Sequence, residues 1–262
     1  MRARQLAALT TFAALLGATP AWRAPVTSRF RVDQTLTQDI DATAAGKGRQ
    51  TVSFSTSSFL TVTLNDTTGG KSVRIVVDSM RGDSASPIPA SVFDSARGAE
   101  FHAFLSAVGK LSSLEAVNVS PAAVRVQGFL TDFFPWVKAG AKPGEHWADT
   151  STQATTNGID SVVVQRVTSY RVIGKETRGT KKAFRVSSEY VSTIHGSQPT
   201  DTGQPARIEG SGTGSGSYFV SPDGTYLGGD WQLRSSLTIA GSFSNAPLPI
   251  TISQTTKVTP IP

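Results

Sequence analysis

The sequence predicts a mainly β protein: a large, curved antiparallel sheet, as a half-barrel or a clamshell, with one or two short covering helices. Three observations lead to this. Apolar residues alternate with polar ones along most of the chain, which is the two-residue period of a half-buried strand. Ser, Thr and Gly are abundant and only 17% of residues are charged, which suits strands with a hydroxyl-rich solvent face. An open sheet of this length must also curl or leave its concave face to another element.

The first 21 residues have the features of a secretory signal peptide. Arg2 and Arg4 precede a mostly apolar run from Leu6 to Gly17, and Thr19-Pro20-Ala21 offers small residues for cleavage. The run is shorter than the ~20 residues that a helix needs to span a bilayer. We therefore expect an exported protein, periplasmic or secreted. The chain has no cysteine, so it holds together without disulfides.

Residues 22–135 form a first β-rich half that ends in a helix. Alternating apolar residues predict three strands, over residues 30–40, 52–64 and 73–77. The alternation slips at Phe59, where we expect a bulge. Residues 82–92 are rich in Ser and Pro and predict a loop. The stretch 101–117 could be a helix, but Gly109-Lys110 divides it and favours the two strands of a hairpin.

The helix of this half begins at Ser120-Pro121. Serine caps free backbone N–H groups, and proline at the first helical position loses no hydrogen bond. Pro135 is expected to end the helix. The apolar residues of its buried face are Ala122, Val126, Phe129, Leu130 and Phe133.

Residues 136–262 repeat the plan as a second β-rich half. Turns are expected at residues 176–180 and at Pro222-Asp223-Gly224, where Gly224 takes the left-handed conformation. Strands are expected over residues 162–172, 184–194, 210–220, 231–239 and 248–258. The similar plans indicate an internal duplication, arranged either as two units or as one continuous domain.

The charge of the chain excludes one class of partner. The formal net charge of +6 falls to +4 when Arg2 and Arg4 leave with the signal peptide. This charge is modest for the length, so no nucleic-acid partner is expected. No apolar run after residue 21 is long enough for a transmembrane segment.

Two sequence patterns partly match known functional motifs. Glu145, His146 and Asp149 could contribute to a metal site, but in a strand or turn they point to different faces, so no metal is expected. Residues 210–214 approach the Gly-x-Ser-x-Gly pattern of hydrolases. Strand residues follow them, however, instead of the helix that the nucleophile turn requires. We assign no catalytic residue and no cofactor, and expect no enzyme activity.

Five aromatic residues form the densest apolar group of the chain. They could line the mouth of an apolar ligand pocket, or they could fix the helix onto the sheet. Their helical spacing favours the second interpretation. The five are Phe129, Phe133, Phe134, Trp136 and Trp147.

Four basic residues crowd the predicted turn at residues 176–180. A basic residue near an anionic membrane surface contributes about 1 kcal/mol of attraction, so this turn could contact phosphate-rich envelope components. The alternative is a solvated hairpin end that discourages edge pairing. The four are Lys175, Arg178, Lys181 and Lys182.

The segment between the two halves carries a resemblance. Phe133-Phe134-Pro135-Trp136, followed by Lys142-Pro143-Gly144-Glu145-His146-Trp147, resembles an F-P stretch before P-G-x-x-W in uncharacterised exported bacterial β-rich proteins. The resemblance implies no activity and no catalytic residues. The expected architecture is also loosely similar to the half-barrels that carry lipoproteins and lipids across the periplasm.

Three hypotheses for function remain. The first is a non-enzymatic exported envelope protein that binds a lipid or another apolar ligand on its concave face, under the helix of residues 121–134. The alternative is a structural or interaction module whose Ser/Thr-rich outer face contacts cell-envelope components. A secreted hydrolase is the third.

Overall fold

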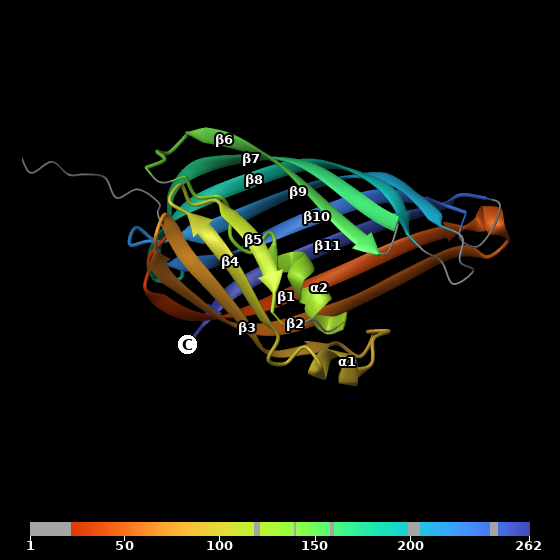
Figure 1. Ribbon diagram of the computed structural model, residues 1–262, viewed down its shortest axis with the longest axis horizontal. Coiled ribbons are helices and arrows are strands. Elements are labelled where there is room, and N and C mark those ends of the chain that lie inside the picture. The colour runs from red at the N-terminus through yellow and green to blue at the C-terminus, as the bar shows by residue number, and fades with distance from the viewer. Residues whose placement is uncertain (1–21, 118–120, 139, 158–159, 199–204, 242–245) are drawn as a thin grey trace, which may run out of the picture.

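One antiparallel sheet contains most of the chain, which confirms the predicted fold class. The computed structural model describes residues 22–117, 121–138, 140–157, 160–198, 205–241 and 246–262 (Figure 1). The predicted signal peptide and the Ser120 cap lie outside the described residues. None of the described helices is long and apolar enough to cross a membrane.

Eleven strands form this sheet. The strands of the first half are β1 (Val26–Ala42), β2 (Gly48–Thr67), β3 (Gly70–Gly82), β4 (Glu100–Ser106) and β5 (Leu111–Ala116). Those of the second half are β6 (His146–Asn157), β7 (Asp160–Arg178), β8 (Lys181–Gln198), β9 (Ala206–Val220), β10 (Tyr226–Ala240) and β11 (Leu248–Ile261). The pairing of β2 with β3 shifts register between Phe59 and Leu60, where a bulge was predicted.

The strand order is β5-β4-β3-β2-β1-β11-β10-β9-β8-β7-β6. Each half is a meander in which consecutive strands pair, and the halves join where β1 pairs with β11. The two halves are therefore one continuous sheet. The sheet curls into a half-barrel, with β5 and β6 as its edges (Figure 1).

The two ends of the half-barrel differ in their turns. We call the end with the β2–β3, β4–β5, β7–β8 and β9–β10 turns the proximal end. The opposite end, where β1 joins β2 through a 3-10 turn (η1, Thr43–Ala45), is the distal end. The proximal end is at the left of Figure 1 and the distal end is at the right.

The predicted helix is α2 (Pro121–Leu130), and it lies within the curve of the sheet (Figure 1). It ends earlier than the expected stop at Pro135. After Leu130 the chain leaves the helix through turns, in which Asp132 N–H and Phe133 N–H donate to the carbonyls of Phe129 and Leu130, each at 3.1 Å. Phe133 and Phe134 are both buried. A shorter helix, α1 (Ala90–Asp94), follows β3.

The main hydrophobic core fills the proximal part of the concave face. Phe30 of β1, Leu60 of β2 and Val77 of β3 have no more than 1% of their surface exposed, and Phe133 packs edge-on against Phe30 at 5.3 Å. Burying a side chain of this size stabilises a fold by about 1.5–3 kcal/mol. These contacts hold α2 and the turns after it against the sheet.

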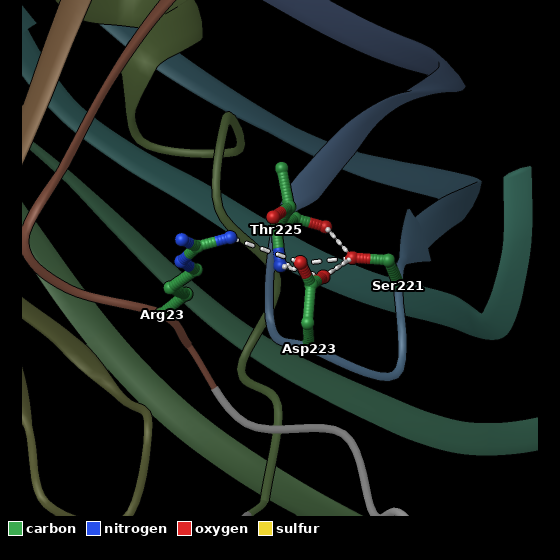
Figure 2. Close-up of polar contacts among 4 residues, drawn as sticks. All are labelled: Arg23, Ser221, Asp223 and Thr225. Atoms are coloured by element: carbon green, nitrogen blue, oxygen red, sulfur yellow. Dashed lines mark hydrogen bonds and ion pairs between the residues drawn. The ribbon is translucent and has the colours of Figure 1, made fainter.

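A polar cluster secures the chain at the proximal end (Figure 2). Ser221 Oγ donates to the Asp223 carboxylate and accepts from Thr225 N–H at 2.9 Å. Arg23 donates to Asp223 at 3.1 Å, and its backbone N–H donates to the carbonyl of Gly224 at 2.8 Å. Gly224 has the predicted left-handed conformation, with φ of 84°.

Candidate functional site

The concave face is much longer than the helix that lies on it. β1 has 17 residues and is about 55 Å long, whereas the 10 residues of α2 span about 15 Å. In Figure 1, both α-helices lie near the middle of the sheet's length. Neither covers the distal part of the concave face.

Apolar side chains continue along the concave face beyond α2. Strand alternation carries the inward face of Phe30 and Val32 on to Leu36 and Ile40, and the same holds on the neighbouring strands. Unlike the core, these side chains are only half-buried. We call them the distal floor: Leu36, Ile40, Phe54, Val162, Val164, Ile194, Leu233, Leu237, Ile239 and Ile252.

A cavity of about 400 Å³ opens where the distal floor meets α2. Leu36 and Phe54 line it from the sheet, Phe129 from α2 and Phe93 from α1. Gln34 and Gln254 also border it. Ligand pockets commonly have volumes of about 300–1,000 Å³ and mostly apolar walls with a few polar groups. We call this space the helix cavity.

A charged pair stands on the concave face beside this apolar surface. Arg166 of β7 donates to both carboxylate oxygens of Asp132, at 2.6 and 3.1 Å. Burial lowers the pKa of Arg166, but the charge and hydrogen bonds of Asp132 outweigh it and leave the pKa above its usual value. The guanidinium also stacks on the ring of Tyr190. The pair ties the turn after α2 to the sheet.

The five aromatic residues predicted to contact ligand do not lie together on one open surface. Phe129, Phe133 and Phe134 are at most 4% exposed and belong to the core, which agrees with the structural interpretation of them. Trp136 and Trp147 are half-buried at the proximal end of β6, with ring centres 6.4 Å apart. Of the five, only Phe129 lines the helix cavity. Ligand contact by these residues stays a prediction.

The basic turn between β7 and β8 is partly occupied by internal contacts. The Arg178 guanidinium lies 3.9 Å from the centre of the Phe219 ring and 3.7 Å from the Asp230 carboxylate. Lys175 lies over Phe184 at 5.4 Å. Lys181 and Lys182 are exposed. Contact of this turn with an anionic surface stays a prediction.

Two of the three residues considered for a metal site have other partners. Glu145 pairs with Lys138 and Asp149 with Lys110, each at 2.6 Å. In the described part of the chain, no three His, Asp or Glu side chains gather in a way that could hold a metal ion. Residues 210–214 lie inside β9, as expected from the strand pattern that follows them.

Sequence reasoning missed the distal floor as a site, although its signal is present. The apolar period of β1 runs on through Leu36 and Ile40, further than a helix of ten residues covers. The pairing of Arg166 with Asp132 has no such signal. The two residues are 34 positions apart and meet only because the sheet curls around α2.

Comparisons with known proteins identify no relative. No family model and no curated protein matches the chain. One solved structure, described as "Asymmetric conductivity of engineered proteins", aligns with 90% of this chain and 100% of its own at 10% identity. Its TM-score is 0.25, which is too low to support an argument. The resemblance to exported bacterial β-rich proteins stays a prediction.

Proposed function

We propose that this protein is a non-enzymatic exported protein of the cell envelope that binds an apolar ligand, or the apolar part of an amphiphile, on its concave face. One observation carries the proposal: the half-buried distal floor continues directly into the helix cavity. Removing apolar surface from water stabilises a complex by about 25 cal/mol per Å². An apolar chain against these side chains would gain that energy.

The polar composition of the outer face supports the choice of the concave face. The outward side chains of β1 and β2 pair through their hydroxyls, Thr35 with Ser55 and Thr37 with Ser53, each at 3.0 Å. Such a face is satisfied by its own hydrogen bonds and by water. The side chains of the distal floor have no comparable hydrogen-bonding groups, because they are aliphatic or aromatic.

Two experiments test the proposal. One looks for lipid in the protein purified from a bacterial envelope, and the other measures binding of the fluorescent apolar probe N-phenyl-1-naphthylamine. We expect a lipid that is released by solvent extraction and seen as added mass in native mass spectrometry. We also expect the probe to bind the delipidated protein and to bind Leu36→Ser at least fivefold more weakly. Val191→Ser is the matched control, since Val191 is an aliphatic residue 59% exposed on the outer face.

Two results would refute the proposal. One is a folded wild-type protein that carries no lipid and binds no probe. The other is equal weakening of probe binding by the Leu36→Ser and Val191→Ser variants, which would place the probe outside the concave face. Circular dichroism of each variant establishes that it is folded before binding is measured.

A further inference from the structure

A second cavity lies on the other side of α2, toward the seam between the edge strands β5 and β6. Its volume is about 680 Å³. It is lined by Lys110 before β5, by Asp132 and Trp136 after α2, and by Asp149, Arg166 and Tyr170 of β6 and β7. We call it the seam cavity. Its walls are far more polar than those of the helix cavity.

The charges of the seam cavity cancel within the protein. Its four charged lining residues form two ion pairs: Lys110 with Asp149 at 2.6 Å and Arg166 with Asp132 at 2.6 Å. A charged ligand would meet a like charge beside every opposite one, and it would have to displace an existing partner. A ligand group without net charge avoids that cost.

The same walls are rich in groups that both donate and accept hydrogen bonds. Ser151, Thr152 and Gln153 of β6 line the cavity. The Lys110 ammonium has three N–H donors, of which one reaches Asp149. Trp136 and Tyr170 add aromatic surface. Hydroxyl groups on an otherwise apolar ring would match this combination, because they donate and accept and leave C–H faces for the aromatic rings.

One residue of α2 connects the two cavities. Gly128 lines both the helix cavity and the seam cavity. It is exposed, and a side chain added there would have no atom within 4 Å of its first carbon. A ligand that extends from one cavity to the other can therefore pass over α2 at Gly128, in contact with the helix backbone.

We propose that the ligand is an uncharged glycolipid-like amphiphile, with its apolar chain in the helix cavity and its polyhydroxylated head in the seam cavity, joined across Gly128. This proposal rests on the proposed function, since it assigns the head group of the same ligand. It predicts that the protein distinguishes between ligands that have the same apolar chain but different head groups.

The test compares three C12 ligands below their critical micelle concentrations, by calorimetric titration of the mature protein. They are dodecyl maltoside, dodecanoate and dodecyltrimethylammonium, with free maltose as a fourth ligand. We expect dodecyl maltoside to bind at least tenfold more tightly than either charged ligand, and maltose alone to bind much more weakly. Equal affinity for the three C12 ligands would overturn the head-group assignment and leave the proposed function intact. Binding of none of them would refute the proposed function as well.

Two variants locate the ligand within the protein. Gly128→Leu fills open space, so the protein stays folded, and we expect its affinity for dodecyl maltoside to fall at least tenfold. Gly128→Ala is the control with a small side chain. Gln153→Ala should weaken dodecyl maltoside about fivefold and leave dodecanoate unchanged, whereas Gln165→Ala, on the outer face of β7, changes neither. Unchanged maltoside binding by Gly128→Leu or by Gln153→Ala would contradict the proposed path.

Discussion

The guanidinium carbon of Arg166 lies 3.7 Å from the centre of the Tyr190 ring. Tyr190 in turn lies across Gly214 of the neighbouring strand, because a side chain on Gly214 would meet the ring at 2.3 Å. With Asp132 bound to the guanidinium, four residues from β9, β8, β7 and the turn after α2 form one stack. Each of these four residues helps to hold the next one in place.

The Arg166→Met variant should be destabilised by about 3 kcal/mol. Only 16% of the Asp132 side chain is exposed, and loss of one partner leaves the other charge buried and unpaired. Urea unfolding followed by circular dichroism measures the change. The double variant Arg166→Met with Asp132→Leu should recover most of it. Equal stability of the single variant and the wild type would show that the pair is solvated.

Alanine at two glycines should shift stability in opposite directions. Gly214→Ala places a methyl group against the Tyr190 ring and should destabilise the fold by about 1–3 kcal/mol, the range for overpacking. Gly128→Ala lies in a helix with open space around it and should stabilise by about 0.4–1 kcal/mol. Both changes are measured as shifts of the urea midpoint. A stabilising Gly214→Ala would contradict the position of the Tyr190 ring.

Asp223 should contribute stability that is lost in acid. Hydrogen bonding from Ser221, opposed by partial burial and aided by the Thr225 N–H, lowers its pKa from 3.8 to about 2. The unfolded chain therefore binds the proton more readily than the folded one, and the contribution is present above pH 4 and disappears as the pH falls toward 2.

The matching experiment compares urea midpoints of wild type and Asp223→Asn at several pH values. The difference between them should be largest at pH 6 and should shrink by pH 2.5. Asp94→Asn, an exposed carboxyl on α1, serves as control. A difference that stays constant with pH would disprove the role of the carboxylate charge.

None of the four tyrosines should ionise at its usual pH in the folded protein. Burial raises the pKa of Tyr170 and of Tyr190 to about 12, and it raises the pKa values of Tyr218 and Tyr226 as well. Absorbance at 295 nm should therefore show little phenolate at pH 11. The protein unfolded in urea should titrate near pH 10. Because the unfolded tyrosines lose protons first, stability should decline as the pH rises above 10.

The fold was more predictable than the site, for physical reasons. Alternation along β1 and the turn residues Gly109 and Gly224 act locally, so they predict strands and hairpins without knowledge of the rest of the chain. Which part of a face is covered depends on distant residues. Phe30 and Leu36 face the same side of the same strand, yet only Phe30 is fully buried. The reason is that α2 and the turns after it cover the sheet at Phe30 but not at Leu36.

Long-range order was out of reach for the same reason. Neither β1 nor β11 contains a residue that indicates the other as its neighbour, so the sequence left open whether the halves form one unit or two. Gly214 looked like one of several small residues in a strand. Only the structure shows that the Tyr190 ring of the neighbouring strand occupies the space that a side chain on Gly214 would need.

The pairing of β1 with β11 also determines when the sheet can be completed. Arg29 and Ile261, which face each other in this pair, stand at opposite ends of the described chain, and closing so long a loop makes folding slow. Until β11 has been synthesised, β1 and β10 each expose a row of unpaired backbone N–H and C=O groups. Such rows are templates for pairing with other chains. The nascent protein therefore passes through a stage in which aggregation competes with folding, and pairing of β11 with β1 and β10 ends that stage.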